Sequence, residues 1–308
     1  MSNISKEYSK KYDNLSDHIN NKINDLLEKK SNNYRKSILI LSGGGMKGIA
    51  HIGALKALKD NNMLQHINTI GCASVGAIVA SMHILGYTPD EMYDFIELFD
   101  MKKVRSCNVD SFFENFGVDD GKKFNIFLEK IFEAKNVSKD ITFKELYAMK
   151  KIKFIMTTVC LNDKQVYYLS HTSFPNLSVI YGIRMTTCVP LWFSPIKYNN
   201  KLFVDGGCID NYPIQLFSNN LNSVIGVYLC EHNDIIENIE NPEDFITNLI
   251  KCFKESITCN SVKGYEKYTV RILLPQITLI ELNLTNIMKK KLYDCGYIAM
   301  NNYIERHL

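Results

Sequence analysis

The sequence predicts an α/β fold with a largely parallel central sheet. From residue 37 onward, short apolar runs alternate with segments of helical periodicity, as in parallel sheets whose strands are joined by helices. Two of the early runs lead through glycine-rich or small-residue turns directly into helices. The 308 residues are 46% hydrophobic and 22% charged, which is a globular composition, and they suffice for a core of substantial size.

The first elements follow one another closely along the chain. Ser37–Ser42 is predicted to be a buried strand, and residues Ile49–Lys59 form a helix after a glycine run. Asn68–Ala73 is a second short strand, which turns at Ser74 into another helix. These two strand-turn-helix units are the strongest indication of the fold class.

A further helix is predicted to begin at Thr88-Pro89-Asp90-Glu91. Threonine is a suitable N-cap, proline is favoured at the first helical position, and acidic side chains suit the first turn. Downstream strands and a final helix are expected at Lys153–Cys160, Gln165–Leu169, Leu202–Val204, Val224–Leu229, Thr269–Leu274 and Thr285–Ile304. Because no clean domain boundary follows residue 36, residues 37–308 are expected to form one domain.

Residues 1–36 differ in composition from the rest of the chain. They carry eight basic and five acidic side chains, so the formal charge of +3 of the whole chain resides here. Leu15, Ile19, Ile23 and Leu26 recur at helical spacing, which predicts a basic amphipathic helix or extension. Three states remain open: packing on the main domain, binding to anionic lipid at a membrane surface, or disorder.

Charge and cysteine usage exclude several classes of protein. An excess of three positive charges is too small for the one-sided basic surface of a nucleic-acid binder, so no nucleic-acid partner is expected. The nine cysteines form no Cys-x-x-Cys pair, and most lie in apolar runs, which indicates free thiols in a reducing compartment and no metal site.

The sequence also favours a cytoplasmic location with at most peripheral membrane contact. The polar start, Met1–Lys6, lacks the apolar stretch of a secretory signal. The most apolar long segment, Gly71–Tyr87, is shorter than the ~20 residues that a membrane span needs. It is therefore interpreted as part of the buried second strand and its helix.

The first candidate motif is Gly43-Gly44-Gly45-Met46-Lys47-Gly48, between a predicted strand and a helix. It matches Gly-x-Gly-x-x-Gly, which can bind a dinucleotide pyrophosphate at a helix N-terminus. A dinucleotide site also needs an acidic residue about 20 positions further on, but the next strand ends in Gly-Cys-Ala-Ser. The backbone N–H groups of such a loop can equally hold an oxyanion.

The second motif, Cys72-Ala73-Ser74-Val75-Gly76, joins a strand to a helix by a sharp turn. This is the shape of a nucleophile elbow, whose usual sequence is Gly-x-Ser-x-Gly. The small residues Ala73 and Gly76 leave the Ser74 hydroxyl free to project, while Cys72 replaces the usual leading glycine. The alternative is that Ser74 is only the N-cap of the helix.

The third motif, Asp205-Gly206-Gly207, follows the predicted strand Leu202–Val204. An acid at that position can turn into a site at the carboxyl ends of parallel strands, where it would serve as the base for a serine nucleophile. The alternative is an ordinary tight turn, in which Asp-Gly-Gly is common.

Together and in this order, the three motifs resemble the patatin-like phospholipase family. The family pattern is a Gly-Gly-Gly-x-Lys/Arg-Gly loop, a Gly-x-Ser-x-Gly serine and an Asp-Gly-Gly/Ala aspartate. The segments Met185–Pro195 and Ile209–Pro213 are similar to those before and after the aspartate strand of the family. The resemblance extends from about Ile38 to Met300 and implies a three-layer α/β/α fold.

The resemblance also implies a reaction and the residues that perform it. Ser74 is the nucleophile and Asp205 the base of a dyad that needs no histidine, metal or cofactor, and the substrate is a phospholipid that loses a fatty acid through an acyl-enzyme. A neutral-lipid esterase, an acyltransferase or an inactive lipid-binding module remain alternatives, and the oligomeric state is open. The implied oxyanion hole comprises Gly43, Gly44, Gly45 and Met46. The supporting motif positions are Lys47, Gly48, Cys72, Gly76, Gly206 and Gly207.

Two other features bear on the site. His51 and His83 lie on the helices that follow the first two motifs, and both are expected to be packed rather than catalytic. Residues 101–123 hold Phe112, Phe113 and Phe116 among several lysines. This segment is predicted to be either a mobile, lipid-contacting flap or an ordinary surface loop.

Overall fold

The computed structural model describes residues 22, 36–98, 100–106, 108, 111–231, 239–240, 245, 248–249, 252, 261–275, 277 and 284–308. The predicted amphipathic helix of residues 1–36 lies outside these residues, apart from positions 22 and 36. Its three possible states therefore stay predictions.

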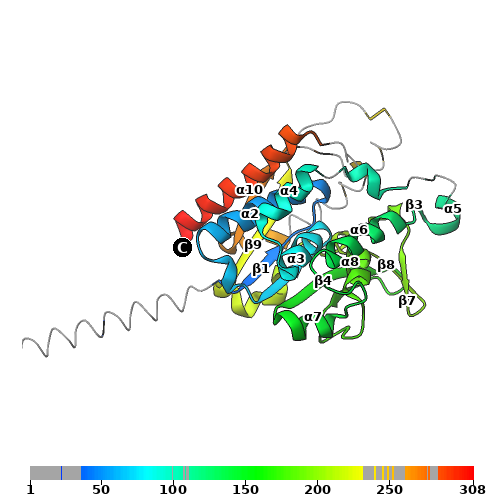
Figure 1. Cartoon of the computed structure of the whole chain (residues 1–308), viewed down its shortest axis with the longest axis horizontal. Coiled ribbons are helices and arrows are strands. Elements are labelled where there is room, and N and C mark those ends of the chain that lie inside the picture. The colour runs from blue at the N-terminus through cyan, green and yellow to red at the C-terminus, as the bar shows by residue number, and fades with distance from the viewer. Residues whose placement is uncertain are drawn as a thin grey trace, which may run out of the picture.

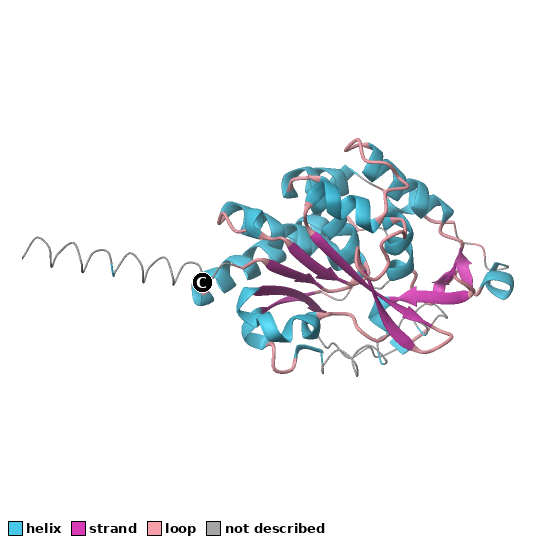
Figure 2. Ribbon diagram, turned by 90° about the horizontal axis from the view of Figure 1, so that it is seen from below, coloured by secondary structure: helices cyan, strands magenta, loops and turns pink. Residues whose placement is uncertain are grey.

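A mixed eight-stranded sheet forms the centre of the molecule (Figures 1 and 2), in the order β10-β9-β1-β2-β4-β8-β7, with β5 paired to β4. The parallel part comprises β10 (Thr269–Leu274), β9 (Val224–Glu231), β1 (Ile38–Leu41), β2 (Thr69–Cys72) and β4 (Lys153–Cys160). The antiparallel strands are β5 (Gln165–Leu169), β7 (Ile196–Tyr198) and β8 (Lys201–Asp205). The predicted α/β fold with a largely parallel sheet is confirmed.

Strand β8 runs in the direction opposite to the one expected from the sequence. Asp205 was expected at the carboxyl end of a parallel strand, which is wrong, because β8 returns from a hairpin with β7 and lies antiparallel to β4. Within the sheet, Asp205 pairs with Thr158 of β4. Two residues earlier on β4, Met156 pairs with Cys72, the last residue of β2. The aspartate therefore reaches the carboxyl end of β2 from the other direction.

The side chains of β1 alternate between two cores, as the two-residue period of a strand requires. Leu39 and Leu41 contribute to the larger core, which the long helices cover, whereas Ile38 and Ile40 face a smaller core on the other side of the sheet. The smaller core is closed by η5 (Ile214–Ser223) and by residues around Val262. The sheet is thus the middle one of three layers.

Helices of the larger core include all the main helices of the described chain. They are α2 (Ile49–Asp60), α3 (Val75–Leu85), α4 (Pro89–Leu98), α6 (Lys122–Glu133), α7 (Phe143–Lys150), α8 (Val179–Thr187) and α10 (Asn286–His307). Helix α4 begins as predicted, since the Thr88 N–H donates to Glu91 Oε2 at 2.7 Å and the Glu91 N–H to Thr88 Oγ1 at 3.2 Å.

Several short elements complete the fold. Beyond the central sheet, β3 (Gly117–Asp119) and β6 (Leu191–Phe193) pair with each other, and α5 (Ser111–Asn115) precedes β3. The short helical turns are η1 (Gly45–Gly48), η2 (Leu64–His66), η3 (Met101–Val104), η4 (Gly206–Cys208) and η6 (Glu266–Tyr268). Residues 101–123, which were predicted to be either a flap or a surface loop, therefore contain η3, α5 and β3.

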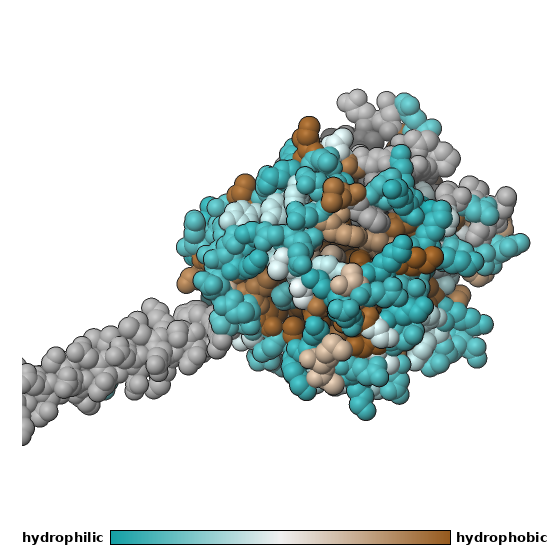
Figure 3. Space-filling model, viewed as in Figure 1, coloured by the Kyte–Doolittle hydropathy of each residue, from teal (hydrophilic) through white to brown (hydrophobic). Residues whose placement is uncertain are grey.

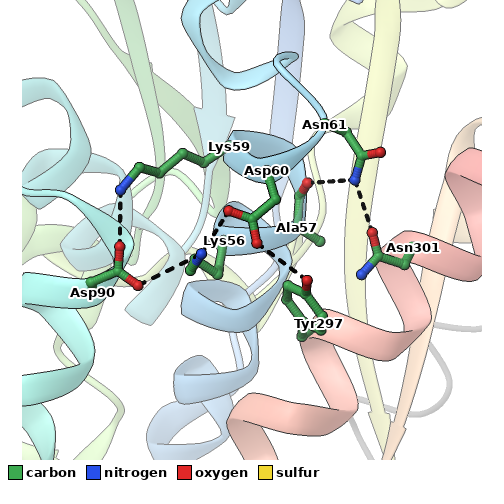
Figure 4. A network of polar contacts seen from close by, with 8 residues as sticks. All are labelled: Lys56, Ala57, Lys59, Asp60, Asn61, Asp90, Tyr297 and Asn301. Carbon is green, nitrogen blue, oxygen red and sulfur yellow. Dashed lines mark hydrogen bonds and ion pairs between the residues drawn. The ribbon is translucent and has the colours of Figure 1, made fainter.

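Helices α2 and α10 lie side by side (Figure 1), with their backbones close at Gly53 and Gly296. A polar network at the surface links them to α4 (Figure 4): Lys59 pairs with Asp90 at 2.9 Å, and Tyr297 donates to Asp60 at 3.2 Å. Exposed ion pairs contribute ~1 kcal/mol at most, so helix packing rather than this network holds α10 in place.

Hydrophilic residues cover most of the face seen in Figure 3, with smaller apolar patches between them. Across the described residues, no helix combines the length and the apolar character that a membrane crossing requires.

Candidate functional site

Ser74 and Asp205 meet at the end of β2, although 131 positions separate them in the sequence. The Ser74 hydroxyl donates to Asp205 Oδ2 at 2.6 Å, and both side chains are buried. The other carboxylate oxygen, Oδ1, accepts the N–H of Gly207 at 2.7 Å. This second bond fixes the rotation of the carboxylate, so that Oδ2 is directed at the serine.

The backbone at Ser74 forms the sharp turn that an exposed nucleophile requires. Its φ of 50° and ψ of −125° lie in a region that residues with side chains rarely adopt. The turn passes directly into α3, and Gly76 allows the helix to approach β1: a Cβ there would lie 2.6 Å from the Leu41 carbonyl oxygen. The strand-turn-helix geometry expected for the second motif is therefore present.

Helix α8 holds both halves of the Ser74–Asp205 pair. Thr186 Oγ1 accepts the N–H of Ser74 at 2.9 Å. The carbonyl of Cys188, directly after the helix, accepts the N–H of Asp205 at 2.9 Å. The sequence did not predict α8 or the role of Thr186, and the only signal was the resemblance of the segment that begins at Met185.

The glycine loop lies against Ser74, because a Cβ on Gly43 would be 3.1 Å from Ser74 Cβ. Gly43 was expected to be an oxyanion donor, but its N–H donates to the Asn211 carbonyl at 3.1 Å, so this N–H is already used. Among the described residues, the N–H groups of Gly44, Gly45 and Met46 have no acceptor. These three donors remain for an oxyanion.

The loop conformation is fixed from several sides. Gly45 has a φ of 57°, in the left-handed region that favours glycine. Ser42, just before the loop, accepts the Leu229 N–H on its hydroxyl at 3.0 Å, which ties the loop to β9. Lys47 is buried, its N–H donates to the Gly44 carbonyl at 3.2 Å, and Gly48 contacts Val75 of α3. The donors are therefore held in place before any substrate binds.

Asn211 joins the glycine loop to the Asp-Gly-Gly turn, a role that the sequence analysis missed. Besides its backbone contact with Gly43, its side-chain Nδ2 donates to the Gly43 carbonyl at 3.4 Å. Its Oδ1 is buried without a partner among the described residues, and a Cβ on Gly207 would lie 2.7 Å from it. Gly206 is equally confined, against Thr157. The sequence signal was the family-like segment Ile209–Pro213.

Comparison with known proteins identifies the family of the chain. The family model for patatin-like phospholipases matches residues 39–218, which include all three motifs. The chain belongs to the patatin-like phospholipase family. It is 30% identical to "Uncharacterized protein R571" of Acanthamoeba polyphaga mimivirus over 279 residues, covering 86% of this chain and 93% of that protein.

One further relative and one solved structure are also similar to this chain. "Probable lipid hydrolase 463L" of Invertebrate iridescent virus 6 is 32% identical over 204 residues, or 62% of this chain and 69% of that protein. The crystal structure of VipD from Legionella pneumophila aligns with a TM-score of 0.62 over 89% of this chain and 67% of VipD. With 15% sequence identity, VipD supports the fold alone.

Cys72 stands where the pattern of the patatin-like family has glycine. Its side chain is buried, and its Sγ donates to the Ile155 carbonyl of neighbouring β4 at 3.4 Å. Burial raises the pKa of the Cys72 thiol well above its ordinary value, so the group stays neutral. Cysteine is thus accommodated within the sheet at this position.

The two histidines near the motifs are not bonded to Ser74 or Asp205. His51 Nε2 donates to the Ser42 carbonyl at 2.8 Å, and its Nδ1 has no partner in the described part of the chain. Burial lowers the pKa of His51 to about 4, against a weaker opposing effect of the Ser42 bond, and burial also lowers that of His83 to about 4. Both rings are therefore neutral at pH 7.

The buried neutral His51 predicts that the protein loses stability in mild acid. The unfolded chain, with an ordinary histidine pKa near 6.5, binds more protons than the folded protein between pH 6.5 and 4, so stability falls as the pH falls. For His51 alone, the free energy of unfolding should drop by about 2 kcal/mol from pH 7 to pH 5. Urea unfolding measures the free energy of unfolding at both pH values, and its drop between them should be smaller by this amount in His51→Gln than in the wild type. An equal drop in both proteins would contradict the assignment.

The described residues contain no group of three or more His, Cys, Asp or Glu side chains that could hold a metal ion. A serine hydroxyl bonded to a carboxylate, beside three unpaired N–H groups, is an arrangement that can provide a nucleophile, a proton acceptor and hydrogen-bond donors for acyl transfer.

Proposed function

We propose that the chain is a lipid acyl hydrolase that releases fatty acids from phospholipids through Ser74 and Asp205. The observation that carries the proposal is the 2.6 Å hydrogen bond between the two buried side chains, beside a loop with three unpaired N–H groups. Membership of the patatin-like phospholipase family supports the substrate class. The name of the iridescent virus relative, a probable lipid hydrolase, is consistent with it.

The first half of the reaction transfers the acyl group to the enzyme. Asp205 Oδ2 accepts the hydroxyl proton as Ser74 Oγ attacks the ester carbonyl carbon. The carbonyl oxygen becomes an oxyanion and accepts hydrogen bonds from the glycine loop. When the tetrahedral intermediate collapses, the proton on Asp205 passes to the leaving lysophospholipid oxygen, and an acyl-Ser74 ester remains.

The second half returns the enzyme to its starting state. Asp205 accepts a proton from a water molecule, whose oxygen attacks the acyl-Ser74 carbonyl, and the same N–H groups stabilise the second oxyanion. Collapse breaks the bond to Ser74 Oγ, which takes the proton back from Asp205. The fatty acid leaves with one oxygen atom from water.

Product analysis tests the substrate class. Phosphatidylcholine with one isotope-labelled acyl chain should give free fatty acid and lysophosphatidylcholine in equal amounts, and hydrolysis in ¹⁸O water should place one heavy oxygen in the acid. Release from triacylglycerol alone would indicate a neutral-lipid esterase, and acyl esters of an added alcohol without free acid would indicate an acyltransferase. Absence of turnover with every ester would contradict an enzyme.

A further inference from the structure

Elements α5, β3 and β6 project at one end of the molecule (Figures 1 and 2), and we call them the apolar tip. In its small sheet, Gly117 pairs with Leu191 and Asp119 with Phe193. Strand β6 begins three residues after Cys188, whose carbonyl accepts the N–H of Asp205. The apolar tip is therefore joined through a short segment to the catalytic pair.

The apolar tip presents large apolar side chains to solvent. Phe113 is 84% exposed, Phe116 is 62% exposed and Leu191 is 37% exposed. Phe113 lies within α5, Phe116 directly follows this helix, and Leu191 pairs with the residue after Phe116, so the three positions belong to one small unit. Large apolar side chains that are exposed together in one small unit are a feature of interaction surfaces.

Two of these residues are held in a backbone conformation that is unfavourable for them. Phe116 has a φ of 59° and Leu191 a φ of 70°, in the left-handed region that bulky side chains rarely adopt. Such strain persists only where the surrounding structure fixes it, and it gathers at functional sites. Both strained positions belong to the apolar surface.

A buried polar cluster fixes the base of the apolar tip. The fully buried carboxylate of Asp119 accepts the N–H of Ser106 at 2.9 Å and pairs with Arg105 at 3.6 Å. The Arg105 guanidinium lies over the Trp192 ring, 5.4 Å from its centroid. These contacts hold β3 and β6, the strands next to the exposed phenylalanines, in place.

Basic side chains lie beside the same buried cluster. Lys123 donates to the carbonyl of Arg105 at 3.1 Å. Arg105 directly follows η3, which carries the exposed Lys102 and Lys103. Asp100 accepts the backbone N–H of Lys102 at 3.0 Å, but neither side-chain ammonium group of η3 forms an ion pair with a carboxylate among the described residues. Aromatic side chains with neighbouring lysines match the interface of an anionic bilayer, where acyl chains begin just below the phosphates.

We propose that the apolar tip docks on an anionic phospholipid bilayer, with Phe113, Phe116 and Leu191 in the interface and the lysines of η3 and Lys123 at the phosphates. The docked tip brings the Ser74–Asp205 pair next to the ester bonds of the bilayer. The inference rests on the proposed function for its substrate, but vesicle binding can be measured without catalysis.

The test compares Phe113→Ser/Phe116→Ser in the full chain with a matched control, Ile287→Ser/Ile298→Ser. The control residues are 84% and 57% exposed on α10, which Figure 1 shows away from α5. Binding is measured by sedimentation with vesicles of ether-linked phosphatidylcholine and phosphatidylserine at 7:3, which cannot be hydrolysed. Binding of the phenylalanine variant should fall at least tenfold, whereas the control should bind like the wild type.

Hydrolysis of p-nitrophenyl butyrate keeps the two proposals separate. The phenylalanine variant should retain this rate within twofold while losing turnover of vesicle phospholipid. Lys102→Gln/Lys103→Gln should weaken binding to the anionic vesicles several-fold and leave binding to pure phosphatidylcholine unchanged. Full vesicle binding by both the double and the single Phe113→Ser variant would overturn the docking surface. If the wild type binds vesicles but hydrolyses no ester, and the phenylalanine variant loses this binding, the result would support docking and refute the proposed function.

Discussion

Replacement of Ser74 by alanine should abolish ester hydrolysis and covalent labelling by a fluorophosphonate probe. The probe reacts with serines whose hydroxyl is activated, and the Ser74 hydroxyl donates directly to a buried carboxylate beside unpaired N–H donors. Without the oxygen nucleophile no acyl-enzyme can form, and the turnover number should fall by roughly 10⁶-fold, to the background rate. The rate on a short soluble ester and mass spectrometry of the labelled peptide measure the two effects.

Ser81→Ala provides the matched control for this experiment. Ser81 is also buried on α3, but its hydroxyl donates to the Ile78 carbonyl at 2.7 Å and has no contact with Asp205. It should keep labelling and activity. Alanine meets the same backbone constraint at position 74 as serine does, so circular dichroism should show both variants folded. Normal turnover by folded Ser74→Ala would exclude the proposed mechanism.

The strand-turn-helix units of the first half of the domain were predictable because their signals are local. An apolar run, small residues at a turn and a capped amphipathic segment were sufficient for β1, β2 and the start of α4. Helix α8 gave no such signal. Its sequence, Val-Ile-Tyr-Gly-Ile-Arg-Met-Thr-Thr, is rich in β-branched residues and has low helix propensity. Burial of nearly the whole helix against the core, a tertiary effect, decides its structure.

The direction of β8 had a signal that the sequence analysis did not use. The two residues between β7 and β8 are Asn199 and Asn200, which favour positive φ, and both adopt it, at 47° and 60°. A two-residue loop of this kind predicts a hairpin. By contrast, the capture of the Gly43 N–H by Asn211 depends on two segments 168 positions apart, so only the three-dimensional structure could show it.

Asp205→Asn should lower the turnover number by roughly 10²- to 10⁴-fold, the usual contribution of a positioned general base. The Gly207 N–H donates to Oδ1, so the substituted amide will place its oxygen there and its NH₂ group toward Ser74. The serine then faces a donor in place of an acceptor and cannot lose its proton. The KM for a short ester should change little, because the shape of the site is preserved.

Three variants decide whether Asp205 acts alone as the base. Asp210→Asn alters another buried carboxylate of the same loop, which accepts from Tyr168 at 3.0 Å and Gln215 at 2.6 Å and does not contact Ser74. It should keep the turnover number within a few fold, as should His51→Gln and His83→Gln, because neither ring is bonded to the pair. A folded histidine variant as inactive as Asp205→Asn would replace the dyad by a triad built on that histidine.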